Sequence, residues 1–214
     1  MKITDACVYP YPCGDSSVRR MALEARALGF DGLVATDTPP CTIDGIDVRS
    51  GILIQASAMK DVIGQVRREK ETGAVVSVQA GDNGFNRAVI GLKGVHILRG
   101  IQSADKKAFD HVTAKMAADN RVALDLDLSL LISGRGIARQ RAIHRYRDIL
   151  VLEQRFGFPI TLSSHARSIL DMRAVREITG LCSILDMDIS GVEKAFSGVD
   201  IITTPPDPVV KVIR

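Results

Sequence analysis

The chain has 214 residues, of which 46% are hydrophobic and 25% are charged, and its formal net charge at pH 7 is +3. These values are typical of a soluble globular protein with one hydrophobic core. No apolar run approaches the ~20 residues that a helix needs to cross a bilayer, and no secretory leader precedes the first strand-like segment, so we expect a cytoplasmic protein without membrane partners.

Short β-rich runs alternate along the chain with amphipathic stretches, a pattern typical of βαβ units. Eight strands are predicted, at residues 2–8, 32–36, 52–57, 74–79, 94–98, 121–128, 159–163 and 199–203. A first helix is predicted from apolar residues at i, i+3, i+4 and i+7 from Val18, with Asp15-Ser16-Ser17 available for its N-cap and Gly29 at its end. Further helices are predicted at residues 60–72, 83–92, 105–118, 137–156, 171–185 and 190–196.

Only residues 38–50 supply no clear helix after their strand, and their prolines and Asp/Gly turns indicate a long loop. Eight strands with nearly one helix each predict an α/β fold, a somewhat irregular (β/α)8 TIM-like barrel that forms a single domain over residues 1–204. Residues 205–214 would form a Pro-rich tail. The alternative is an open doubly wound sheet, but the sequence lacks the Gly-rich turn that usually accompanies that fold.

Arginines are concentrated between residues 133 and 177, where nine arginines accompany four acids and no lysine. A planar guanidinium matches the oxygens of a phosphate, so the pattern indicates phosphate recognition. In the helix predicted at residues 137–156, Arg141, His144, Arg145 and Arg155 fall opposite the apolar stripe. We expect about half of the cluster to pair instead with Asp148, Glu153, Asp171 and Glu177.

Candidate catalytic residues are sparse. Asp125 and Asp127 lie two apart on one predicted strand and so face the same side, where they could hold a metal or share a proton; ion pairing with nearby arginines is the preferred interpretation. The histidines are isolated, and the cysteines lack metal-ligand spacing. Ser163-Ser164-His165 lacks a nucleophile elbow, which favours capping or backbone bonding for both serines.

The segment from Phe158 to Arg173 resembles the RNase P protein component 3 family, the archaeal relatives of the thirty-kilodalton eukaryotic RNase P and RNase MRP subunit. Members carry a run like S-S-G-A-R-x-x-x-x-L-R-x-P-x-D after the penultimate strand, behind an arginine-rich helix. This chain matches the run at Ser163, Ser164, Ala166, Arg167 and Arg173. Two departures occur. His165 stands in place of the usual glycine, which tolerates a positive φ more readily than histidine does, and Val175-Arg176-Glu177 replaces a proline-acid pattern.

The family is also similar to the PHP class of metal-dependent phosphoesterases, which begin with an H-x-H strand. This chain has no histidine near Asp5 or Asp37, and Gln55 stands where that class offers a glutamate. The resemblance therefore implies a PHP-like barrel without metal ligands, without catalytic residues and without a cofactor of its own, because nothing remains to activate water on a metal.

The implied function is that of a non-catalytic protein subunit of ribonuclease P, the ribonucleoprotein that removes the 5′ leader of precursor tRNA. Its partners would be the RNase P RNA, precursor tRNA and other protein subunits, among them the component-two subunit, with Mg²⁺ held by the RNA. Low aromatic content favours structured RNA over single strands. The candidate RNA-binding residues are Arg99, Arg135, Arg139, Arg141, Arg145, Arg147, Arg167, Arg173 and Arg176.

The alternative from a different class is a metal-dependent phosphoesterase of the PHP type. It would use Asp125, Asp127 and His165, with the arginines, on a small phosphorylated substrate.

Overall fold

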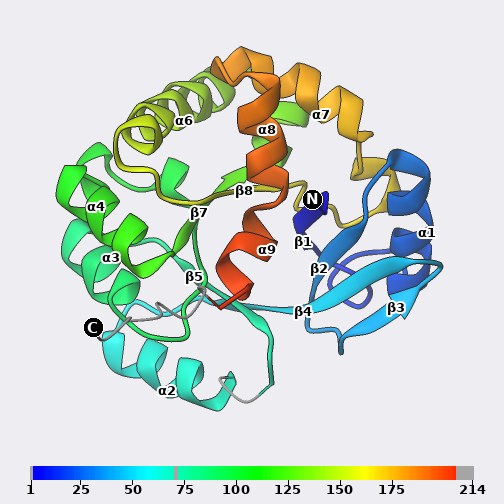
Figure 1. Cartoon of the computed structure of the whole chain (residues 1–214), viewed down its shortest axis with the longest axis horizontal. Helices are drawn as coiled ribbons and strands as arrows, with labels where there is room; N and C mark the ends of the chain where they lie inside the picture. Colours follow the sequence, from blue (N-terminus) through cyan, green and yellow to red (C-terminus); the bar gives the residue numbers. More distant parts are fainter. Residues whose placement is uncertain (1, 70–71, 206–214) are drawn as a thin grey trace, which may run out of the picture.

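The computed structural model describes residues 2–69 and 72–205. Seven parallel strands curl into a barrel in the order β1-β2-β4-β5-β6-β7-β8, and a short β3 pairs antiparallel with β4 at one side (Figure 1). The strands are β1 Thr4–Val8, β2 Gly32–Thr36, β3 Cys41–Ile43, β4 Ile46–Ile54, β5 Val75–Gln79, β6 Ile97–Arg99, β7 Ala123–Asp127 and β8 Ile160–Ser163. The predicted α/β barrel is confirmed.

Most of the helices lie around the outside of the barrel, whereas α9 lies across its middle in Figure 1. The helices are α1 Val18–Leu28, α2 Met59–Glu69, α3 Asn83–Ile90, α4 His111–Asn120, α5 Ser129–Ile132, α6 Gly136–Phe156, α7 Val175–Cys182, α8 Ile189–Phe196 and α9 Gly198–Thr203. In α1, Ser17 accepts a hydrogen bond from Arg20 N and Gly29 ends the helix at a φ of 93°, so both predicted caps are confirmed. The helix predicted at residues 105–118 starts later, at His111, because Asp110 caps it.

One predicted strand is wrong. The strand predicted at residues 199–203 is helix α9, although its β-branched residues favour a strand. Strand β8 meets β1 directly, through a bridge between Val8 and Ala166, which leaves no place for a strand between them. Helix α9 instead contributes Val199 to a small apolar cluster with Ala6, Val34, Val75, Ile97 and Ala123, residues of five barrel strands.

The loop predicted at residues 38–50 is a hairpin. Cys41 pairs with Val48 and Ile43 with Ile46, around Asp44 and Gly45, which both have positive φ. The turn residues were recognised, but β4 begins at Ile46 rather than Ile52, because Ile46 and Val48 are buried. Residues 206–214 lie outside the described residues, so the Pro-rich tail and the single domain stay predictions.

Among residues 2–69 and 72–205, none of the helices combines the length and the apolar character needed to span a bilayer. The main core lies between the sheet and the helices, and Phe109, Tyr146, Phe158 and Phe196 are its largest fully buried side chains. This packing holds the carboxyl ends of the strands, and the loops that follow them, at one end of the barrel.

Candidate functional site

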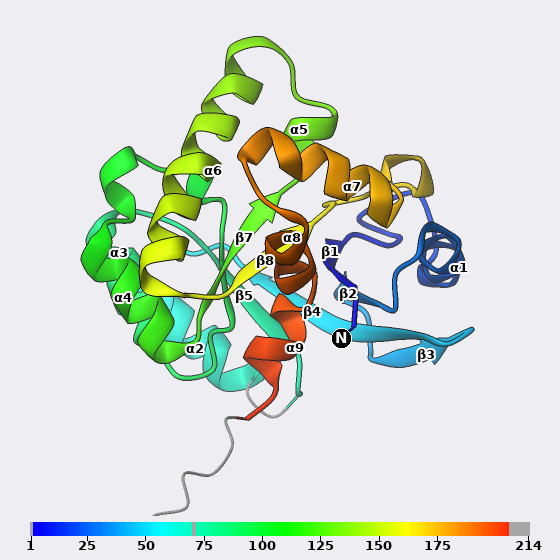
Figure 2. The same ribbon diagram turned by 45° about the horizontal axis from the view of Figure 1, so that its top comes forward.

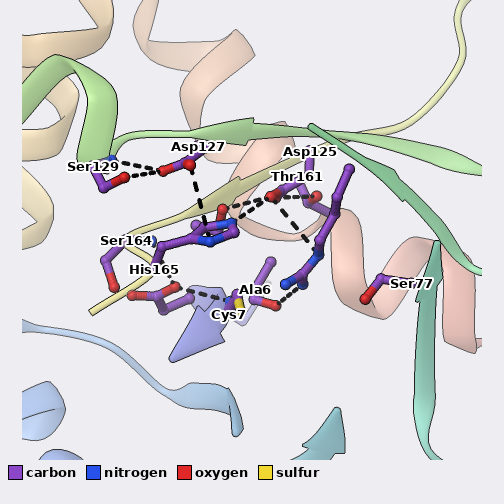
Figure 3. Close-up of polar contacts among 12 residues, drawn as sticks. Ala6, Cys7, Ser77, Asp125, Asp127, Ser129, Thr161, Ser164 and His165 are labelled. Carbon is purple, nitrogen blue, oxygen red and sulfur yellow. Dashed lines mark hydrogen bonds and ion pairs between the residues drawn. The ribbon is translucent and has the colours of Figure 1, made fainter. Parts of the chain in front are cut away.

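A buried ion pair joins Arg99, the last residue of β6, to Asp125 in β7. Arg99 Nε lies 3.8 Å from Asp125 Oδ2, and the two side chains are 4% and 1% exposed. Arg99 Nη2 also donates to the carbonyl of Ala6 at 2.5 Å. Figure 3 shows the polar contacts of Asp125, Asp127 and His165. Burial alone would raise the pKa of Asp125, but the charge of Arg99 and hydrogen bonds to His165 and Ser163 lower it below its usual value.

Both carboxylate oxygens of Asp125 have hydrogen-bond partners within the chain. Thr161 donates to Oδ1 at 2.9 Å, Ser163 donates to Oδ2 at 2.6 Å, and His165 Nε2 lies 3.1 Å from Oδ2. Asp127 lies on the same face and accepts from Ser129 N at 2.9 Å. The preferred pairing of Asp125 with an arginine is thus confirmed, but with Arg99 and not with the cluster at residues 133–177.

His165 adopts a φ of 51°, the left-handed conformation that glycine enters most easily. Both ring nitrogens have partners: Nε2 lies 3.1 Å from Asp125 Oδ2, and Nδ1 lies 3.4 Å from Tyr9 Oη. Of the two preceding serines, Ser164 accepts from Ala166 N, as expected. Ser163 instead donates to Asp125, so the prediction of backbone bonding is wrong for it.

Asp5 is the second buried carboxylate of this end of the barrel. Its Oδ1 accepts from Cys7 N at 3.1 Å and from Ser164 N at 3.0 Å, while Oδ2 is buried with no hydrogen-bond partner. Burial raises the pKa of Asp5, and it also raises the pKa of Asp127 and of the Cys7 thiol. For Asp5, the effect of burial on the pKa exceeds that of the hydrogen bonds from Ser164 and Cys7, which lower it.

These residues do not fit a metal centre. Within residues 2–69 and 72–205, no group of three or more His, Cys, Asp or Glu side chains is arranged to hold an ion. The oxygens of Asp125 already accept hydrogen bonds from Thr161 and Ser163, and Arg99 supplies the compensating positive charge. We therefore assign this network a structural role.

Two of the nine candidate RNA-binding arginines are buried, and a third pairs with a carboxylate at the surface. Arg99 belongs to the buried network just described. Arg145 is also buried, against the expectation that it faces away from the apolar stripe; its guanidinium lies 3.5 Å from Ile101 O and 3.4 Å from Asp105 O. Arg147 pairs with Asp186 at 3.0 Å. The prediction that Arg145 faces solvent is wrong, because Arg145 lies on the buried side of α6 next to Tyr146 and Ile149.

The other six predicted arginines form what we call the arginine rim: Arg135, Arg139, Arg141, Arg167, Arg173 and Arg176. Among the described residues none of them has a carboxylate within 4.0 Å. Arg135, Arg141, Arg167 and Arg176 are exposed, and the other two are partly buried. The rim therefore offers guanidinium groups that no carboxylate of residues 2–69 and 72–205 pairs with.

The expected pairing of the cluster with its four acids is wrong. Asp148 pairs with Lys106 at 2.9 Å, and Glu153 pairs with Lys194 at 2.7 Å. Asp171 accepts from Arg167 N and Ser168 N, and Glu177 accepts from Ala174 N, so these two cap backbone groups. Sequence spacing could not reveal these partners, because the lysines lie 42 and 41 residues away along the chain.

The rim lies at one end of the barrel. A helix that follows a parallel strand begins near the carboxyl end of that strand. Arg135 to Arg141 lie at the start of α6, after β7, while Arg167 and Arg173 lie in the loop after β8 and Arg176 lies in the first turn of α7. In Figure 2 the end of α6 nearest α5 stands out from the barrel.

The sequence interpretation missed a neighbouring part of this surface. Strand β1 lies beside β8, and the helix that follows it carries exposed Arg19 and Arg20 in its first turn. Exposed Tyr11 lies in the loop between β1 and α1. These residues are about 150 positions away from Arg167 along the chain, so only the closure of the barrel brings them to the same side.

A family model described as RNase P subunit p30 matches residues 2–203. The chain belongs to this family. Ribonuclease P protein component 3 of Methanococcoides burtonii is 31% identical over 191 residues, which are 86% of this chain and 79% of the relative. Its counterpart in Haloarcula marismortui is 30% identical over 200 residues, 89% of this chain and 85% of the relative.

The fold agrees with that of a solved structure. A chain in the cryo-EM structure of archaeal ribonuclease P with mature tRNA matches with a TM-score of 0.75 at 19% identity, covering 92% of this chain and 89% of that chain. Family membership confirms the predicted protein subunit of ribonuclease P and favours it over the metal-dependent phosphoesterase.

Proposed function

We propose that the arginine rim binds the RNA of ribonuclease P and stabilises its folded form while the RNA removes the 5′ leader of precursor tRNA. The observation that carries this proposal is the set of six arginines at one end of the barrel without a carboxylate partner among the described residues. Positive charge at close range neutralises the repulsion between neighbouring phosphates and adds affinity that depends on salt.

Two rim arginines are held in place by the protein. Arg167 donates to Cys13 O at 2.9 Å, and its guanidinium carbon lies 4.8 Å from the centre of the Tyr9 ring. Arg173 donates to Leu170 O at 2.8 Å and to Met172 O at 2.7 Å. A guanidinium has five N–H donors, so each arginine keeps donors for a phosphate. Fixing the side chain beforehand reduces the entropy lost on binding.

The remaining partners follow from the same proposal. Other protein subunits, the component-two subunit among them, would share the RNA, and precursor tRNA would bind the assembled particle. The Mg²⁺ needed for cleavage would be held by the RNA, and the chain would have no catalytic residue, since Asp125 is occupied by Arg99 and its hydrogen-bond donors. We further propose that the protein is cytoplasmic.

Arg167→Ala and Arg173→Ala are each expected to lower the cleavage of precursor tRNA by a reconstituted particle, because each removes a positioned phosphate contact. The thermal unfolding midpoint should fall only slightly, since Arg167 is exposed and Arg173 is partly buried, although each variant also loses hydrogen bonds to backbone carbonyls. Arg67→Ala removes an equal charge from α2 and is expected to leave cleavage unchanged. Normal cleavage by both rim variants would refute the assignment, as would metal-dependent phosphatase turnover that Asp125→Ala abolishes.

A further inference from the structure

Two large apolar side chains stand almost fully in solvent beside the arginine rim. Leu170 is 79% exposed and Tyr11 is 74% exposed, more than any other large hydrophobic residue of the described chain. A tyrosine ring in water leaves apolar surface that a flat partner can cover. Such a pair next to positive charge indicates a contact surface rather than random exposure.

The two loops that carry these side chains are joined by hydrogen bonds. Tyr9 N donates to Ala166 O, and Asp15 N donates to Arg167 O, both at 2.8 Å. Ser16 connects the loops directly: its carbonyl accepts from Tyr11 N at 2.8 Å, and its Oγ accepts from Ile169 N at 3.3 Å. The loops that carry Tyr11 and Leu170 therefore lie next to each other, although 159 positions separate the two residues in the sequence.

This surface carries two arginines together with two aspartates. Arg167 and Arg173, which are held by backbone carbonyls, lie in or next to the same loop as Leu170. The two acids nearby are engaged within the protein, since Asp171 accepts from Arg167 N and Ser168 N and Asp15 accepts from Ser16 Oγ. The loops thus present two guanidinium groups, one aromatic ring and one aliphatic side chain to an anionic partner.

An unpaired nucleotide combines the two properties that this surface matches. Its base has a flat face that stacks on an aromatic ring, and its flanking phosphates accept from guanidinium groups. We propose that Tyr11 stacks on an unpaired nucleotide of RNA, with Leu170 beside the base or ribose and with Arg167 and Arg173 on the adjoining phosphates. This inference rests on the proposed RNA-binding function and adds to it a preference for a nucleotide outside a duplex.

The test measures binding of the full chain to a single-stranded adenosine oligonucleotide and to an RNA duplex with the same number of phosphates, by fluorescence anisotropy. Tyr11→Ala is expected to weaken binding of the single strand roughly tenfold and to leave duplex binding unchanged. Tyr11→Phe should bind like the parent chain, because stacking needs the ring and not the hydroxyl. Equal effects of Tyr11→Ala on both RNAs, or no effect on either, would overturn the proposal.

Arg167→Ala separates this inference from the function on which it rests. If Arg167→Ala weakens the binding of both RNAs while Tyr11→Ala weakens the binding of neither, the rim binds RNA but the stacking proposal is wrong. If neither variant matters, both proposals fail. In the reconstituted particle, a photoreactive phenylalanine analogue at position 11 should crosslink to RNA. A crosslink to a protein subunit instead would show that an acidic protein partner covers the surface, which overturns the proposal.

Discussion

Replacing Arg99 with methionine is expected to lower the free energy of unfolding by about 3 kcal/mol, because it leaves a buried carboxylate without its compensating charge. Asp125 is only 1% exposed and ionises readily in the native protein because the charge of Arg99 and the surrounding donors lower its pKa. The carbonyl of Ala6 would also lose a donor. Methionine retains most of the apolar volume, so the loss reports mainly on charge.

Two further variants isolate the cause. Arg155→Met removes an exposed arginine from the last turn of α6 and is expected to change the free energy of unfolding by less than about 0.5 kcal/mol. Adding Asp125→Asn to Arg99→Met should recover part of the loss, since the uncompensated charge is gone. Denaturant unfolding measures all three; a cost for Arg99→Met no larger than that for Arg155→Met would contradict the structural role.

Gly14→Ala is expected to lower the free energy of unfolding by about 1 to 3 kcal/mol, because the substitution forces two backbone carbonyls apart. A Cβ at position 14 would lie 2.1 Å from Tyr9 O and 2.2 Å from Arg167 O. Both carbonyls belong to the joined loops that seat Arg167, and they cannot rotate away as a flexible side chain could. The same variant should therefore also weaken RNA binding.

Gly64→Ala provides the matched control for this effect. Gly64 lies in α2, and a Cβ there would meet no atom within 4 Å. Alanine favours the helix, so this variant is expected to gain about 0.5 to 1 kcal/mol. Opposite shifts of the two thermal midpoints would confirm that the loops are in tight contact. A neutral Gly14→Ala would mean that the loops are looser than the structure shows.

The local parts of the fold were accessible from the sequence because they depend on short-range patterns. Apolar periodicity and capping residues predicted α1 and α6 closely, and alternation of strands with helices predicted the barrel. Helix α9 was mistaken for a strand because its β-branched residues carry no sign that β8 already pairs with β1. That information lies in the closure of the barrel and not in any window of the chain.

The sequence shows where arginines are concentrated but not which of them lack a carboxylate partner. The segment between residues 133 and 177 pointed to the arginine rim, and the family resemblance pointed to RNA. Which arginines are free depends on distant partners: Arg99 on Asp125, Arg147 on Asp186, and the local acids on lysines or on backbone N–H groups. Tyr11 could not be found either, because an exposed tyrosine has no sequence pattern of its own.

The salt dependence of RNA binding tests the central claim most directly. Removal of three rim charges by Arg167→Gln, Arg173→Gln and Arg176→Gln in one chain should reduce the slope of log K against log salt by roughly 1 for each arginine that contacts a phosphate. Arg67→Gln with Arg68→Gln removes charge from α2 and should leave the slope unchanged. A triple variant with the slope of the parent chain, or an equal loss in the α2 variant, would contradict the assignment of the rim as the RNA-binding surface.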